Sequence, residues 1–171
     1  ATRDFIKDTV APTTPSSLAL FSPATSPGSD TTPTITISGV TNGLSVKMFT
    51  DNSCSTQTGS TGSATGATIN IDSSALADGS TTNFYANATD AAGNTSTCST
   101  ATVQYVTDTS NPTVAITSPA ANSYIYSGNK AAFTVSGTCS ENTRNVTVTA
   151  AGQTTTATCT AGAWTKTLDL S

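Results

Sequence analysis

The sequence predicts an all-β protein built from tandem β-sandwich domains, and three kinds of observation support this prediction. Serine and threonine supply more than a third of the 171 residues, whereas charged residues supply only 9%. Threonine and valine favour extended, half-buried strands, and the helix formers Glu, Lys, Leu and Gln are scarce. Short segments alternate apolar and polar residues between turns rich in Gly, Asn, Asp, Pro and Ser. The chain also repeats itself after about one hundred residues, the length of one small sandwich.

The first full repeat contains six predicted strands and a short edge strand. Its strand segments alternate, as in Leu18-Ala19-Leu20 and Thr34-Ile35-Thr36-Ile37, so that one face meets a core and the other meets water. Turn-rich stretches such as residues 23–30 and 59–66 separate the strands. We predict strands at residues 17–21, 33–38, 45–50, 67–72, 83–89 and 99–107, and the edge strand within 56–62.

A second repeat follows at an offset of about 98 to 100 residues. Residues 1–9 (ATRDFIKDT) match residues 101–109 (ATVQYVTDT), and Ser22-Pro23 matches Ser118-Pro119. The apolar stripes predict five further strands, around Val114/Ile116, Ile125, Phe133/Val135, Val146/Val148 and Leu168/Leu170.

This repeat predicts the domain organisation. Residues 1–7 are expected to be the last strand of a preceding repeat, residues 8–108 a complete domain closed by 99–107, and residues 109–171 a partial domain without its final two strands. An incomplete sandwich leaves a buried face uncovered and strand edges unpaired, which is costly. We therefore expect the chain to be an excerpt of a longer one, with the second domain completed from outside residues 109–171. The alternative is strand exchange, with residues 1–7 of another copy as the donor.

The four cysteines predict two disulfides in an oxidising compartment. Their spacings match no CxxC zinc pattern, and the chain contains no histidine to complete one. An even number of cysteines in a Ser/Thr-rich chain favours disulfides, and four small buried thiols are the alternative. Because each pair lies inside one predicted domain, we expect Cys54 to join Cys98 and Cys139 to join Cys159.

Several motifs resemble those of the bacterial immunoglobulin-like repeats of large surface adhesins and biofilm proteins. The residues that carry the resemblance are 8–12 (DTVAP), 75–80 (ALADGS), 88–96 (ATDAAGNTS), 136–141 (SGTCSE) and 162–164 (GAW). The resemblance implies tandem immunoglobulin-like β-sandwich domains, with the Asp-Ala-Ala-Gly-Asn segment in the turn between the last two strands. The chain departs from the family at Thr81 and Thr82, where a tyrosine or similar residue usually follows the Asp-Gly-Ser turn.

The same resemblance raises calcium as a cofactor, because such repeats are often rigidified by calcium near domain junctions. The candidate ligands are Asp8, Asp90 and Asp108, here named the junction aspartates. Calcium needs six or more oxygen ligands, and the chain has no dense DxDxD cluster. We therefore favour the alternative, in which the junction aspartates cap turns and the protein has no cofactor.

Other functions find little support in the sequence. A net charge of −4 with scattered cations argues against nucleic acid, and no stretch is apolar enough to span a membrane. No signal peptide begins the chain, so an export signal is expected outside it. Without histidine the usual base for a serine or cysteine nucleophile is missing, and no catalytic residue is predicted. Tyr124 and Tyr126, predicted to share a strand face, and Trp164 are the aromatic candidates for glycan contact. For Trp164 we favour packing in the core or on a sheet face, and for the tyrosines the alternative is cover of a sheet edge.

The sequence therefore predicts a non-enzymatic stalk or spacer segment of a bacterial extracellular surface protein. Its expected partners are neighbouring repeats of the same chain or other copies in a fibre, together with a cell-surface ligand that the sequence does not identify. The alternatives are a module that binds a glycan or protein through a loop such as residues 51–66, and an accessory region of a secreted enzyme.

Overall fold

The computed structural model describes residues 6–171 and divides the chain into two compact units. Unit 1 comprises Ala1–Ser110 and unit 2 comprises Asn111–Ser171. The strand expected at residues 1–7 lies mostly outside the described residues, and Ile6 and Lys7 are exposed and not in a strand.

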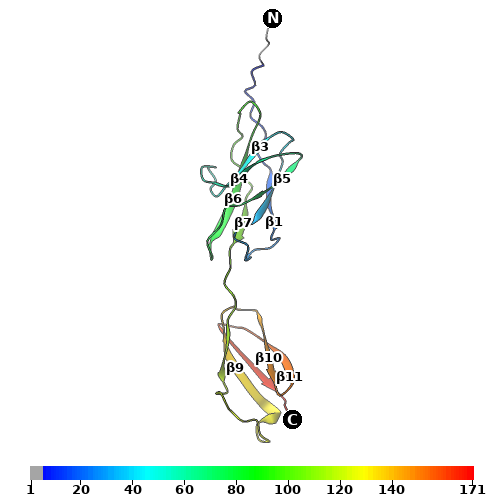
Figure 1. Cartoon of the computed structure of the whole chain (residues 1–171), viewed down its shortest axis with the longest axis vertical. Coiled ribbons are helices and arrows are strands. Elements are labelled where there is room, and N and C mark those ends of the chain that lie inside the picture. Colours follow the sequence, from blue (N-terminus) through cyan, green and yellow to red (C-terminus); the bar gives the residue numbers. More distant parts are fainter. Residues whose placement is uncertain (1–5) are drawn as a thin grey trace. The chain divides into compact units, whose positions relative to one another are not determined.

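Within residues 6–110, unit 1 forms seven antiparallel strands in two sheets (Figure 1). One sheet has the order β1-β2-β5 and the other the order β4-β3-β6-β7. The strands are β1 (Ser17–Ser22), β2 (Thr34–Ser38), β3 (Ser45–Phe49), β4 (Gln57–Ser63), β5 (Thr68–Asp72), β6 (Thr81–Thr89) and β7 (Val103–Val106). The prediction of an all-β protein is confirmed in this unit, with a full strand β4 where a short edge strand was expected.

Alternate residues of both sheets meet in one core in unit 1. Ile35 and Ile37 of β2 and Phe84 of β6 are fully buried, whereas the residues between them on these strands are more exposed. Tyr105 of β7 is also fully buried, and its hydroxyl donates to the carbonyl of Asp30 at 2.9 Å. The period-two pattern of the sequence thus places one face of each sheet on the core.

The predicted strand at 99–107 is wrong over its first half, because residues before β7 bind β6 in another way. The hydroxyls of Ser96 and Ser99 accept hydrogen bonds from the amides of Ala88 and Ala86, at 3.1 and 3.0 Å. The amides of the two serines in turn donate to the carbonyls of the same alanines, at 2.8 and 2.9 Å. Serine hydroxyls therefore accept the two β6 amides that backbone carbonyls would accept in a regular antiparallel pair. Cys98 lies in this irregular stretch.

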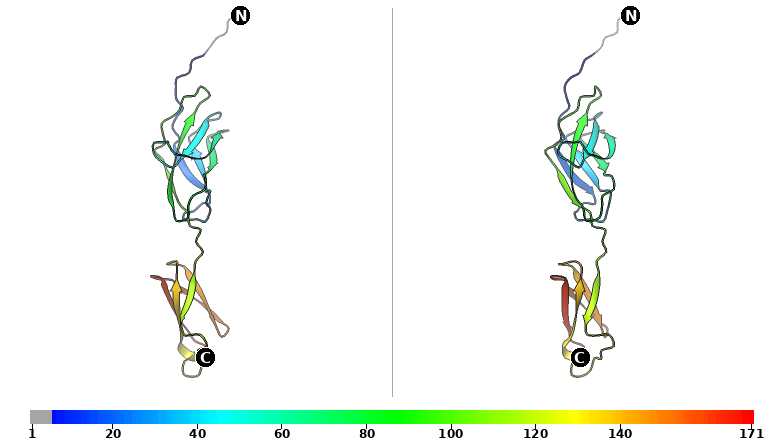
Figure 2. Two further views of the ribbon diagram at one scale, coloured as in Figure 1. Left: turned by 60° about the vertical axis from the view of Figure 1, so that its left-hand side comes forward. Right: turned by 90° about the vertical axis from the view of Figure 1, so that its left-hand side faces the viewer.

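Unit 2 consists of five strands and one turn of 3₁₀ helix, again all antiparallel (Figures 1 and 2). One sheet has the order β12-β9-β8, and a second has only β10 and β11. The elements are β8 (Val114–Ser118), η1 (Lys130–Ala132), β9 (Phe133–Cys139), β10 (Asn145–Ala150), β11 (Gln153–Thr158) and β12 (Ala163–Leu168).

Three strand predictions for unit 2 need correction. Ile125 is not in a strand, because the Asn129 side chain accepts from the Tyr126 amide at 2.8 Å and donates to the Tyr124 carbonyl at 3.1 Å, which folds this segment into a turn. Strand β11 was not predicted, since it is threonine-rich and buries only Ala157. The last strand is β12, which ends two residues before Leu170.

Trp164 of β12 is the largest side chain in the small core of unit 2. Its Nε1 donates to the carbonyl of Thr138 at 3.1 Å, and its indole lies over Gly137 of β9. A Cβ at position 137 would lie 2.8 Å from the indole and would collide with the backbone oxygen of Ala115, so only glycine fits. The buried side chains of this core are Val135, Val148, Ala157, Trp164 and Leu168.

Candidate functional site

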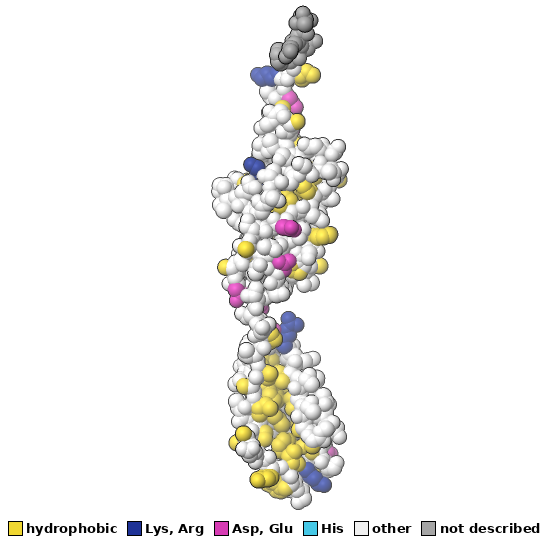
Figure 3. All heavy atoms as spheres, in the orientation of Figure 1, with side chains coloured by type: hydrophobic (Ala, Val, Ile, Leu, Met, Phe, Trp, Pro, Cys, Tyr) yellow, Lys and Arg dark blue, Asp and Glu magenta, His cyan; other side chains and the backbone are white. Residues whose placement is uncertain are grey.

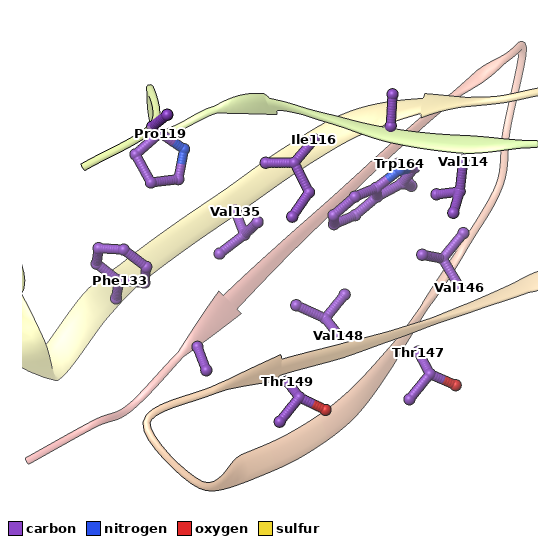
Figure 4. Close-up of a pocket in the computed structure, with 13 residues that line it drawn as sticks. Val114, Ile116, Pro119, Phe133, Val135, Val146, Thr147, Val148, Thr149 and Trp164 are labelled. Carbon is purple, nitrogen blue, oxygen red and sulfur yellow. The ribbon is translucent and has the colours of Figure 1, made fainter. Parts of the chain in front are cut away.

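An open apolar groove between the two sheets is the main surface feature of unit 2. It has a volume of about 680 Å³, and hydrophobic side chains gather along it on the face of unit 2 seen in Figure 3. In Figure 4, Ile116, Val135 and Trp164 point into it from one sheet, and Val146 and Val148 point into it from β10. The lining residues are Val114, Ala115, Ile116, Pro119, Ala121, Phe133, Val135, Val146, Thr147, Val148, Thr149, Ala150 and Trp164, none of them charged.

The outer side of this groove is exposed to solvent. Val114 and Ile116 of β8 are 59% and 66% exposed, although their spacing in the sequence is that of a buried strand face. Monomeric proteins rarely expose contiguous apolar surface of this kind without a partner. Strand β8 is thus the only strand of unit 2 whose residues are all exposed.

Strand β10 borders the same groove with an unpaired backbone edge. Within residues 6–171, β10 pairs with β11 alone, in the register Val146 to Ala157 and Val148 to Thr155. The corresponding inner strand of unit 1, β3, pairs on both sides, with β4 and with β6. The amides and carbonyls on the free side of β10 therefore remain available to an added strand.

A disulfide closes each unit. Cys139, at the end of β9, is joined to Cys159, which follows β11, so this bond connects the two sheets of unit 2. Cys54, in the β3–β4 loop, is joined to Cys98, so the bond in unit 1 ties this loop to the irregular stretch that runs beside β6. These two bonds include all four cysteines of the sequence.

The segment that enters unit 1 is hydrogen-bonded to the turn after β6. The Asn94 side chain donates to the backbone carbonyl of Asp8 at 3.3 Å and to the Asp90 carboxylate at 2.9 Å. Asp90 also accepts the amides of Ala92 and Asn94, each at 2.9 Å. These bonds, above all the one from the Asn94 side chain, hold the pKa of Asp90 below its usual value. The turn that holds the entering segment is therefore itself rigidly organised.

The segment that leaves unit 1 is held by Asp78, in the turn before β6. Its carboxylate accepts the amide of Thr109 at 2.7 Å and the hydroxyl of Ser110 at 3.1 Å. The contacts with Thr109, first of all the bond from its amide, lower the pKa of Asp78. Because β6 and β7 are antiparallel, the turn after β6 and the exit after β7 lie at opposite ends of the sheet.

The loop at residues 51–66, the alternative site for ligand contact, has one carboxylate, Asp51, and residues of the same loop donate hydrogen bonds to it. Asp51 accepts the hydroxyl of Ser53 and the amide of Thr56, the latter at 2.6 Å. Two further bonds come from the amide and hydroxyl of Ser55, both to Oδ1, at 3.1 Å each. Led by the bond from Ser53, these contacts hold the pKa of Asp51 well below its usual range. The carboxylate therefore stabilises the loop next to Cys54.

The three junction aspartates do not form one site: the Asn94 side chain links Asp8 and Asp90, but Asp108 lies apart from both. Each accepts the amide of the residue two positions later, the contact that a turn cap makes: Val10 for Asp8, Ala92 for Asp90 and Ser110 for Asp108. Asp90 follows β6 whereas Asp108 follows β7, at opposite ends of unit 1. Within the described residues, no three side chains among His, Cys, Asp and Glu lie close enough to hold a metal ion.

The aromatic candidates for glycan contact have different environments. Trp164 is buried in the core of unit 2, whereas Tyr124 and Tyr126 are 85% and 61% exposed on the turn after β8. In the part of the chain that the structure describes, no helix is long and apolar enough to cross a membrane.

Comparisons with protein-family models, with curated proteins and with solved structures give no match to this chain.

Proposed function

We propose that this chain is a load-bearing spacer segment of an extracellular surface protein, built from tandem immunoglobulin-like domains, with a structural rather than a catalytic role. In such a segment, force enters at one end of each domain and leaves at the other. The organisation of unit 1 supports this proposal, because the entering and leaving segments are bound at opposite ends of its sheet.

Sheet order supports the proposed domain type. The strands of unit 1 form a three-stranded and a four-stranded antiparallel sheet with a common core, which is the strand number and layering of immunoglobulin-like sandwiches. Unit 2 repeats the three-stranded sheet and the β3–β4 pair in the same chain order. The two disulfides are compatible with an oxidising, extracellular environment.

Pulling the chain by its two ends in a force spectrometer tests the proposal. We expect unit 1 to unfold in a single force peak, because its sheets share one core. The Cys54–Cys98 bond spans 44 positions of sequence, and these residues stay locked while the bond is intact. Reduction should therefore lengthen the unfolding step of unit 1 by about 150 Å, at roughly 3.3–3.6 Å per extended residue.

The double variant Cys54→Ser/Cys98→Ser is the matched control and should give the longer step without reductant. A spacer that carries load must resist extension. If unit 1 extends without a force peak, like an unfolded peptide, the proposed role is wrong.

A second candidate function, contact with a glycan or protein through unit 2, rests on the exposure of Tyr124 and Tyr126. Exposed tyrosines offer flat apolar rings with a polar end, which suits sugar faces. Titration of soluble glycans, followed through the NMR signals of the two tyrosine rings, tests this function. Unchanged ring signals at millimolar glycan would argue against it.

A further inference from the structure

The groove of unit 2 lies where unit 1 holds two additional strands. In unit 1 the three-stranded sheet β1-β2-β5 faces the order β4-β3-β6-β7. In unit 2 the sheet β8-β9-β12 faces β11-β10, which lacks counterparts of β6 and β7 within the described residues. In unit 1, β1 lies against β7, and its counterpart β8 is the strand with the exposed Val114 and Ile116.

Unit 1 also shows which side chains this place accepts. Phe84, Ala86 and Ala88 of β6 are fully buried, and the two alanines lie opposite Met48 and Val46 of β3. Small residues of the added strand thus face large apolar residues of the inner strand, and the aromatic ring fills the space beyond them. In unit 2, the valines of β10 are the large residues that require small partners.

The chemistry of the groove excludes most other occupants. Its lining has no charged side chain, so an ionic ligand would lose its hydration without gaining a counter-charge. An apolar small molecule would leave the free backbone edge of β10 unpaired. An extended polypeptide satisfies both features, because its backbone pairs with the edge while alternate side chains enter the groove.

We propose that the groove of unit 2 takes an antiparallel pair of polypeptide strands of the β6–β7 type. The first strand pairs with the free edge of β10 and presents an aromatic residue followed by small apolar residues at alternate positions. The second strand covers β8. In unit 1 the polypeptide itself supplies this pair, as β6 and β7 after β5, which shows the order and spacing that such a pair takes on this framework.

A peptide titration on the 171-residue chain tests this proposal. The probe is a synthetic peptide of residues 78–108 carrying Cys98→Ser, which contains both strands of unit 1. Millimolar peptide matches the effective concentration of a segment tethered by a short linker, on the order of 1 mM. The matched control peptide carries Phe84→Ser and Ala86→Asp in addition, which changes two inward positions and leaves the outward face intact.

We expect saturable NMR shifts in β8, β10 and the Trp164 indole, with unit 1 unchanged, and binding of the control peptide weaker by about tenfold or more. Equal binding of the two peptides, or no shift at millimolar peptide, would overturn the proposal. The proposal would also be wrong if the NMR signals of β10 shifted with the concentration of the chain but not with added peptide, because a second copy of the chain would then cover the groove. None of these outcomes depends on the force response of unit 1, so this inference and the spacer role can fail separately.

Discussion

Unit 2 should depend on its disulfide for folding, whereas unit 1 should survive the loss of its own. The perturbations are the double variants Cys139→Ser/Cys159→Ser and Cys54→Ser/Cys98→Ser, each of which removes one bond. The bonded cysteines are 20 positions apart in unit 2 and 44 positions apart in unit 1. Loop-closure entropy then gives a stabilisation of about 3.3 kcal/mol for the bond in unit 2 and about 4 kcal/mol for the bond in unit 1.

The two units differ in how much free energy of unfolding their cores supply once the disulfide is removed. A core in a domain below about 70 residues rarely supplies more than about 3–5 kcal/mol, and the core of unit 2 is open on one side. Loss of its disulfide should therefore unfold unit 2 at 25 °C. The closed core of unit 1 extends over both of its sheets, so this unit should stay folded with a melting temperature lower by roughly 15–30 °C.

Amide NMR spectra of the two double variants resolve the units separately and check this prediction. The signals of unit 2 should collapse into the narrow range of an unfolded chain in the first variant, while those of unit 1 keep their dispersion. A first variant with both units folded, or a second variant in which unit 1 unfolds at 25 °C, would refute the reasoning.

Three further predictions concern single positions and solution conditions. Gly137→Ala should destabilise unit 2 by about 1–3 kcal/mol in urea unfolding, because a Cβ there would lie 2.8 Å from the Trp164 indole. The control variant Gly66→Ala has open space around it and should change the stability of unit 1 by no more than about 0.5 kcal/mol. The pKa values of Asp78 and Asp90 are lowered in the folded state, so their stabilising bonds are complete above about pH 4 and are lost as the pH falls through the lowered values. The urea midpoint of unit 1 should therefore drop in that acidic range. The variant Asp90→Asn should make this drop smaller. Excess chelator should leave both melting temperatures unchanged, because the junction aspartates are occupied by turn amides, and a rise on adding calcium would contradict this.

Period-two alternation accounts for the elements that the sequence predicts well. Ile35 and Ile37 mark β2 unambiguously, because two β-branched residues flanked by threonines suit a strand with one buried face. The same signal fails for β11, where threonine occupies nearly every position and only Ala157 faces the core. It also misleads at Ile125, where the Asn129 side chain bonds the backbone of Tyr124 and Tyr126 on either side and folds the segment into a turn.

The candidate sites differ in how far the sequence reveals them. The apolar spacing of Val114 and Ile116 is visible in the sequence, and so is the lack of matching strands within residues 109–171. The bonds from the Thr109 amide to Asp78 and from Asn94 to Asp8 join residues 31 and 86 positions apart, and the sequence carries no signal for such long-range contacts. Turn residues at Asp78 and Asn94 predict a turn, but not which segment the turn will bind.

The position of Trp164 gives this chain a built-in optical probe. It is the single tryptophan of the sequence, and it lies in the core of unit 2 beside the groove. Fluorescence excited selectively at the indole therefore reports on unit 2 alone, while the tyrosines, which both units contain, report on the whole chain. Collisional quenching of the indole by a small neutral molecule measures how open the groove is, and it distinguishes an empty groove from a filled one without any label.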